Sequence, residues 1–434
     1  MSHNDSEQTN MGKGKIIANE YIYSILTRFL SIAISLCQSI LAARYLGSAL
    51  KGSSIYIRSI TSIGAIIVTF GMHQAYPYFR KKYGKENIFV EYINAVRMVF
   101  FTAFLALLGA SFFFSNVEVK AALLLIPIMG FADVLAYVCM IDTPNIRNRW
   151  WTIIYFLELC FVISLMLFTK ASLTTAIILL GFADTLKIIV YSIILRTKLS
   201  FTRKTFKLAK QMAMFGFLPM LALLMTTLNY RVDVLMLKHY SIVSDSLLGI
   251  YSIGINVAER VVLIPDTLKG ILASKLSKGA DDSEVSKVCR LCLWASVLMC
   301  IVFLLVGDWG IRLLYGPEYD GAYQVMAISA VGAIFIGYFK LIAQYNIINR
   351  KQIYNVIILS ISILVNIIGN LIFIPLYGIN GAALATGIGH IVCGIVFVMW
   401  FCYKTDTRIW KMVIISKNDI KLVSEMLKGH KNDK

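Results

Sequence analysis

Charged side chains lie inside stretches of the chain that are otherwise apolar, and they are the strongest candidates for chemistry within a membrane. A charge at the centre of a membrane helix costs about 2.5–3.5 kcal/mol, so these residues should face one another or a watery cavity. The basic ones are Arg28, Arg58, Arg97, Lys187, Arg231, Arg260, Lys269 and Lys340, and the acidic ones are Asp133, Glu158, Asp184, Asp233, Glu259 and Asp266. Arg97 and Lys269 are near the ends of their stretches, where long side chains can reach the membrane surface.

Polar residues, most of them uncharged, form stripes on three of the apolar stretches. The stripes are Ser24, Arg28, Ser31, Ser35 and Gln38; Ser252, Asn256, Glu259 and Arg260; and Asn355, Ser362, Asn366 and Asn370. Helical spacing places each set on one face. Stripes in both halves of the chain predict a hydrophilic space between the halves, although such residues also hold helices together.

Arg231 and Asp233 are two positions apart, which puts them on different faces of a helix. Arg231 is therefore expected to face the cavity, while Asp233 pairs with another helix or with a coupling cation. Pro219 and Pro265 interrupt helical hydrogen bonding and predict bends in helices that move.

The composition identifies the elements that must hold these residues. Of 434 residues, 58% are hydrophobic and only 15% are charged, against about 25% charged in soluble domains. This predicts an all-α polytopic membrane protein of about 12 transmembrane helices. The expected spans are 21–41, 54–72, 94–114, 121–141, 151–169, 173–195, 215–237, 247–274, 291–306, 322–345, 353–375 and 379–402.

The spans divide into two six-helix bundles, 1–195 and 215–402, joined by a basic connector, 196–214, and followed by a basic tail, 403–434. The connector is expected to be an amphipathic helix along the inner face of the membrane. Lysine and arginine concentrate in alternate connections, which places both termini in the cytoplasm.

The chain lacks a GxxxxGK[ST] loop, an HExxH motif and a Gly-rich nucleotide fingerprint, so we expect neither an enzyme nor a cofactor. The CxxC pair of Cys289 and Cys292 has no second pair nearby, so no metal site is expected either. Transport is the favoured function.

From the seventh span onward the sequence resembles the polysaccharide flippases (O-antigen or capsule type) of the multidrug/oligosaccharidyl-lipid/polysaccharide exporter superfamily. The resemblance rests on an ordered series of motifs: Arg231-x-Asp233, Gly249-Ile250-Tyr251, Ile264-Pro265, Gly316-Pro317-Glu318-Tyr319, and a string from Asn370 through Pro375 and Gly378 to Thr386. The N-terminal half contributes only Arg44-Tyr45-Leu46-Gly47 and a loose match from Gly52 to Tyr56.

The resemblance implies a V-shaped transporter of the bacterial plasma membrane. Its cargo would be an undecaprenyl-diphosphate-linked oligosaccharide, flipped by alternating access and coupled to a proton or sodium gradient. The expected cargo-binding residues are Arg28, Arg58, Arg231, Arg260, Lys340, Asn366 and Asn370, and the expected ion-coupling residues are Asp233 and Glu259. A glycan polymerase and glycosyltransferases would be partners.

Two other functions stay open at this point. A multidrug antiporter of the same superfamily would need acidic or aromatic walls for cationic drugs. A membrane glycan polymerase would need a long exposed loop, and the expected outer connections are short.

Overall fold

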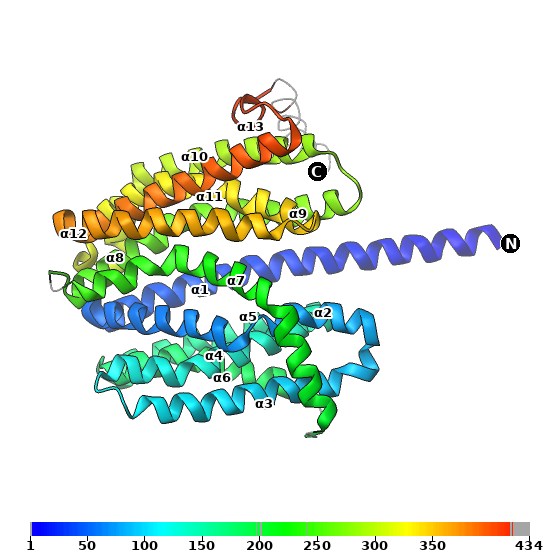
Figure 1. Cartoon of the computed structure of the whole chain (residues 1–434), viewed down its shortest axis with the longest axis horizontal. Coiled ribbons are helices and arrows are strands. Elements are labelled where there is room, and N and C mark those ends of the chain that lie inside the picture. The colour runs from blue at the N-terminus through cyan, green and yellow to red at the C-terminus, as the bar shows by residue number, and fades with distance from the viewer. Residues whose placement is uncertain (1, 197, 200–201, 241, 417–418, 420–434) are drawn as a thin grey trace. The chain divides into compact units, whose positions relative to one another are not determined.

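The computed structural model describes the backbone of all residues except 1, 197, 200–201, 241, 417–418 and 420–434, and side chains for that part except residues 2–29, 85 and 87. Helices form almost all of the described chain, which contains no strand (Figure 1). The first six helices are α1 (Ser2–Thr69), α2 (Met72–Tyr83), α3 (Lys85–Ser111), α4 (Val117–Asp142), α5 (Pro144–Phe168) and α6 (Leu173–Ile194). They are followed by α7 (Arg203–His239), α8 (Asp245–Ala258), the 3₁₀ helix η1 (Glu259–Val262), α9 (Leu263–Ser277), α10 (Asp282–Tyr315), the 3₁₀ helix η2 (Pro317–Tyr319), α11 (Ala322–Ile348), α12 (Gln352–Thr405) and α13 (Trp410–Val413).

The described residues contain ten helical segments that are long and apolar enough to cross a membrane. Two of them, Leu30–Tyr83 and Gln352–Thr405, have 54 residues each. At 1.5 Å per residue either would be about 80 Å long if straight, far more than the ~30 Å hydrocarbon layer. Both contain a glycine with non-helical backbone angles, Gly47 and Gly378. Each therefore supplies two crossings, and the prediction of about 12 helices is confirmed.

The chain forms two compact units. Unit 1 comprises Met1–Leu50 and Ile60–Met220, and unit 2 comprises Lys51–Ser59 and Leu221–Lys434. α1 thus contributes to both units, while α7, continuous from Arg203 to His239, begins in unit 1 and ends in unit 2. Residues 203–214 of the expected connector and the expected seventh span form this one helix, which contains Pro219.

In unit 1, α4 packs against α2, α3, α5 and α6. Its core is apolar and includes Tyr76 and Tyr92, whose rings are tilted against each other by 55° with centroids 4.6 Å apart. Helix starts are defined by local chemistry: Asn116 caps α4 by accepting hydrogen bonds from Glu118 N and Val119 N, and Pro144 occupies the first turn of α5. These are favourable residues at those positions.

In unit 2, α11 packs against α8, α9, α10 and α12. The chain of α12 doubles back at Gly378, whose φ of 57° lies in the left-handed region. The two halves then touch closely, because a Cβ atom on Gly381 would lie 2.0 Å from Phe373 O. A larger residue at 381 cannot fit without moving backbone, so this glycine permits the antiparallel contact.

The segment of α1 that belongs to unit 2 packs against α8. A Cβ atom on Gly52 would lie 1.9 Å from Asp245 O and 3.0 Å from Gly249 N. Two motifs of the family resemblance, Gly52 to Tyr56 and Gly249-Ile250-Tyr251, therefore lie on helices whose backbones touch within unit 2. Lys238 is ion-paired with Asp245 and lies over the Tyr56 ring, 5.3 Å from its centroid.

The expected eighth span is broken in the middle. α8 ends at Ala258, the four residues of η1 follow, and α9 starts at Leu263 with Pro265 in its first turn. A 3₁₀ turn within a membrane helix often marks a hinge. The interruption predicted from Pro265 is thus present, and it contains Glu259 and Arg260.

The chain beyond α12 returns to unit 2. Trp294 Nε1 donates to Val413 O at 2.8 Å, and Tyr338 Oη donates to Met412 O at 3.1 Å. Met412 is completely buried. Of the expected tail 403–434, residues 417–418 and 420–434 lie outside the described residues.

Candidate functional site

A buried carboxylate occupies the middle of unit 2. Asp233 on α7 is only 2% exposed. It accepts hydrogen bonds from the Tyr251 hydroxyl on α8, from Val234 N at 2.7 Å and from Thr386 Oγ1 on α12 at 3.3 Å. Hydrogen bonds from neutral donors reduce the cost of burying a carboxylate without removing its charge. Three helices therefore meet at one acidic group.

Polar side chains of α12 extend this cluster. Asn366 Nδ2 donates to Thr386 Oγ1 at 3.1 Å, and Asn370 Nδ2 donates to Asn366 Oδ1 at 2.7 Å. Both asparagines are 0% exposed. The reversal of the chain at Gly378 brings Thr386 beside these two asparagines. Hydrogen bonds therefore join the two halves of α12, and Thr386 connects them to Asp233.

Some buried polar atoms in and around this cluster have no hydrogen-bond partner. Asn370 Oδ1, Asn229 Nδ2 and His390 Nε2 are buried and have no hydrogen-bond partner among the described residues. Unpaired buried polar atoms are uncommon in folded proteins, and each requires an explanation such as a water or an ion. An unpaired amide oxygen close to a carboxylate is a plausible cation ligand in chemical terms, because hard cations prefer oxygen donors.

A second charged cluster surrounds the break between α8 and α9. Asp266 Oδ1 is 2.6 Å from Lys269 Nζ, and Asp266 Oδ2 is 2.8 Å from Lys340 Nζ on α11. Lys269 pairs with Asp266 within its own helix, and its reach to the membrane surface stays a prediction. Lys340, expected to bind cargo, is held by Asp266 in this conformation.

Arg231 and Arg260 differ from Lys340. Both are partly buried, and both lie close enough to Glu259 to influence it electrostatically. Within the described part of the chain, neither guanidinium has an ion-pair partner within 4 Å. Arg231 is more exposed than Asp233, as their spacing of two residues predicts. Unit 2 therefore presents two guanidinium groups that are available to an anion.

The remaining expected site residues fall in different places. Arg58 is partly buried in the α1 segment of unit 2. The side chain of Arg28 lies outside the described residues. The structure thus brings Arg231, Arg260, Glu259 and Lys340 together, and joins Asn366 and Asn370 to Asp233 rather than to the arginines.

Several residues of the polar stripes hold helices together. Ser31 Oγ is 2.7 Å from Thr152 Oγ1, and Gln38 Nε2 donates to Glu158 Oε1 at 3.1 Å, both between α1 and α5. Ser362 Oγ donates to Asn229 Oδ1 at 2.9 Å. These hydrogen bonds show that part of each stripe connects neighbouring helices, as polar residues in membrane helices often do, and the hydrophilic space between the two halves stays a prediction.

Sequence reasoning missed the partners of Asp233. Tyr251 and Thr386 both occur in motifs that carry the family resemblance, but neither is among the expected site residues. A hydroxyl on an apolar helix is a weak signal by itself. Only the meeting of α7, α8 and α12 gives these hydroxyls their role.

No family model matches the sequence. An uncharacterized membrane protein of Methanocaldococcus jannaschii is 34% identical over 96 residues, a match that covers 22% of this chain and 18% of that protein. The chain thus spans less than a fifth of that relative's length.

Solved structures are similar over almost the whole chain. The lipid II flippase MurJ in an inward closed conformation has a TM-score of 0.69 and 19% identity, covering 94% of this chain and 93% of that one. An inward-facing MATE family multidrug resistance transporter of the MOP superfamily has a TM-score of 0.62 and 12% identity, covering 88% and 98%. A mutant of the Vibrio cholerae MATE transporter VcmN has a TM-score of 0.57 and 12% identity, covering 91% and 98%. The chain is a multi-pass membrane protein with the fold of MurJ and the MATE transporters.

Proposed function

We propose that the chain is a flippase that moves undecaprenyl-diphosphate-linked oligosaccharide from the cytoplasmic to the outer leaflet by alternating access. The observation that carries this proposal is the pair Arg231 and Arg260, partly buried and without an ion-pair partner among the described residues. Guanidinium groups match the oxygens of phosphate in geometry and charge, most strongly where water is scarce. The diphosphate would bind at these two residues.

Other expected residues take secondary places in the proposed site. Arg58 would contribute positive charge, and Lys340 would join once Asp266 releases it. The break at η1 supports alternating access, because Arg260 lies on it and moves whenever it changes conformation. The proposal requires no catalytic residue and no cofactor.

Asp233 is the better candidate for ion coupling. It is more deeply buried than Glu259, and Asn370 Oδ1 offers an unpaired oxygen within the same network. In this proposal a proton or a sodium ion binds at Asp233, and Asn366 and Asn370 serve the ion rather than the cargo. Glu259 lies beside the two arginines, and its negative charge would partly compensate their positive charge when cargo is absent.

The proposed setting is the bacterial inner membrane, with both termini in the cytoplasm. Glycosyltransferases would build the cargo on the cytoplasmic side, and a glycan polymerase would use it on the other side. These partners follow from the chemistry of the cargo.

A leaflet assay tests the proposal. The purified protein is reconstituted in liposomes that contain a fluorescent undecaprenyl-diphosphate oligosaccharide, and a membrane-impermeant quencher reports how much label reaches the outer leaflet. We expect Arg231→Gln and Arg260→Gln each to slow flipping by about tenfold or more, the effect of losing a charge-assisted hydrogen bond. Arg312→Gln is the matched control, since Arg312 is exposed and paired with Asp320. Flipping at the native rate in both variants would contradict the proposal.

A multidrug antiporter is the second candidate, favoured by one observation: Asp233 is an acidic group with no basic partner within 4 Å in the described part of the chain. Efflux of a cationic dye, lost in Asp233→Asn and kept in Arg231→Gln, would support it over the flippase. A glycan polymerase would instead form longer glycan when the purified protein is incubated with the lipid-linked sugar alone.

A further inference from the structure

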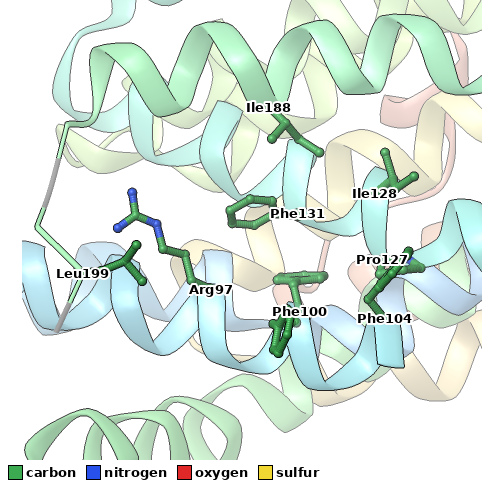
Figure 2. Close-up of a pocket in the computed structure, with 9 residues that line it drawn as sticks. Arg97, Phe100, Phe104, Pro127, Ile128, Phe131, Ile188 and Leu199 are labelled. Atoms are coloured by element: carbon green, nitrogen blue, oxygen red, sulfur yellow. The ribbon is translucent and has the colours of Figure 1, made fainter. Parts of the chain in front are cut away.

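Unit 1 contains a cavity that the proposed function does not use. Its volume is about 460 Å³, and it lies between α3, α4 and α6 and the chain that follows α6. Figure 2 shows Arg97 and Leu199 at one end and Phe104 with Pro127 at the other, with Phe100 and Phe131 between them. Every lining residue except Arg97 is apolar. Pockets of this size can hold a small molecule or part of a lipid.

The position of Arg97 along α3 sets the depth of this cavity. Arg97 is followed in α3 by 14 uncharged residues, Met98–Ser111, after which the helix ends. About 20 residues are needed to cross the hydrocarbon layer. Fourteen residues span only about 21 Å of helix, so the long side chain of Arg97 is what lets its guanidinium reach the edge of the hydrocarbon, near the lipid phosphates. The aromatic part of the cavity extends along α3 away from that charged end.

Hydrogen bonds fix the charged end. Arg97 Nη1 donates to Asn94 Oδ1 at 3.2 Å, and Asn94 Nδ2 donates to Lys198 O at 3.1 Å. Asn94 is completely buried, whereas the side chain of Lys198 is exposed. One buried amide thus links the Arg97 side chain to the backbone of Lys198, the residue next to the lining residue Leu199.

Phe101 and Leu199 are 64% and 71% exposed, so the cavity opens to the surroundings of the helices. In a membrane those surroundings are lipid. The apolar lining offers nothing to satisfy the hydroxyls of a sugar or the amides of a peptide, and buried polar groups without partners are costly. A chain of methylene groups with one anionic end has the matching chemistry.

We propose that this cavity is a binding site for an anionic phospholipid of the bilayer, with one acyl chain among the phenylalanines and the phosphate at Arg97 and Lys198. Basic pockets between transmembrane helices are known to bind lipid headgroups. The bound chain would fill the space between α3 and α4 and stabilise unit 1. This inference does not depend on which cargo the protein moves.

Photo-crosslinking tests the site directly. The full chain is reconstituted in nanodiscs of phosphatidylcholine and phosphatidylglycerol, in which one or the other carries a diazirine at the end of an acyl chain, and crosslinked peptides are identified by mass spectrometry. We expect labelled phosphatidylglycerol to crosslink within 100–104 and 127–131. Arg97→Gln should reduce that yield by about tenfold, equivalent to one charge-assisted hydrogen bond, and Arg149→Gln, an exposed arginine of α5, should not.

A second pair of variants covers the case in which Arg97→Gln folds poorly. Ile128→Trp fills the cavity and should displace the crosslinks while the protein keeps its size-exclusion profile, and Leu167→Trp on the exposed face of α5 should leave them unchanged. Equal crosslinking by both lipids at these positions, insensitive to Arg97→Gln, would overturn the anionic site. Displacement of the labelled lipid by undecaprenyl phosphate, but not by unlabelled phosphatidylglycerol, would overturn the assignment to a bilayer phospholipid.

Discussion

Arg290 on α10 and Asp419 form an ion pair across 129 residues of sequence, with 2.6 Å between Arg290 Nη2 and Asp419 Oδ2. Arg290 also donates to Lys411 O, and Asp419 accepts from Ser416 N at 2.8 Å. Asp419 is 1% exposed. The chain after α12 is thus anchored to unit 2 by a buried charge pair as well as by Trp294 and Tyr338.

Asp419→Asn should release this anchor. Removing one partner of a buried pair leaves the other charge uncompensated, at a cost of about 3–5 kcal/mol. We expect a lower Tm in detergent and new protease cleavage after Thr405. Asp308→Asn, another carboxylate of unit 2, is the control, and unchanged proteolysis in Asp419→Asn would contradict the anchor.

The same pair makes the anchor sensitive to acid. The hydrogen bond from Arg290 holds the pKa of Asp419 below its usual range despite burial. A depressed folded-state pKa contributes stability that is full above the ordinary carboxyl pKa of about 4 and is lost as the pH falls below it. Between pH 7 and pH 5 the Tm difference between the native chain and Asp419→Asn should therefore stay constant, and below pH 4 it should shrink. A difference that grows on acidification would show that another group is responsible.

Asp266→Asn should strengthen cargo binding. Asp266 neutralises Lys340 in this conformation, so removing its charge frees an ammonium beside Arg231 and Arg260. One more available cation at a partly buried site is worth roughly 1 kcal/mol, or about fivefold in affinity. The concentration of lipid-linked oligosaccharide that gives half-maximal flipping should fall by that factor. Asp320→Asn, which frees the exposed Arg312, should change nothing, and an unchanged half-maximal concentration in Asp266→Asn would remove Lys340 from the proposed site.

Tyr251→Phe should weaken ion coupling without unfolding unit 2. The variant removes one donor to Asp233 and keeps the ring, at a cost of about 1–3 kcal/mol. Flipping should then respond less to an imposed sodium or proton gradient. Tyr323→Phe is the matched control, because Tyr323 Oη donates to Leu304 O at 2.9 Å in the same unit. Equal losses of gradient response in both variants would mean that the effect is one of stability alone.

Gly381→Ala should disrupt the reversal of α12. The added methyl would lie 2.0 Å from Phe373 O, and the neighbouring atoms are also backbone, so the two halves must separate. We expect loss of folded protein or a fall in stability of at least about 2 kcal/mol. Gly310→Ala on α10 has nothing within 4 Å of the new methyl, and it should be neutral or slightly stabilising. Similar behaviour of the two variants would contradict the close contact.

The helices were predictable because apolar runs of membrane length dominate the sequence. Gly47 and Gly378 lie between expected spans, and both interrupt helices in the structure. The continuity of α7 from Arg203 through the expected connector was not predictable. No feature of residues 203–218 marks where a helix on the membrane surface would become one that crosses it.

The site was predictable only in part. Asp233, Glu259 and Arg231 were identified because charge is expensive in an apolar helix. Asn366 is connected to Asp233 by hydrogen bonds through Thr386, and this connection depends on which helices meet and in what register. A single sequence does not specify such pairings, because serine, threonine and asparagine suit many neighbours.

The four residues of η1 have a mechanical consequence for everything that follows them. A 3₁₀ helix has three residues per turn and an α-helix has 3.6, so rewinding Glu259–Val262 into an α-helix would rotate α9 by about 80° relative to α8 and shorten the rod by about 2 Å. Asp266 and its partner Lys269 would turn with α9, and Asp266 would move away from Lys340 on α11. A change of helix type over these four residues is thus sufficient to separate Asp266 from Lys340 and to leave the positive charge of Lys340 unpaired beside the arginines.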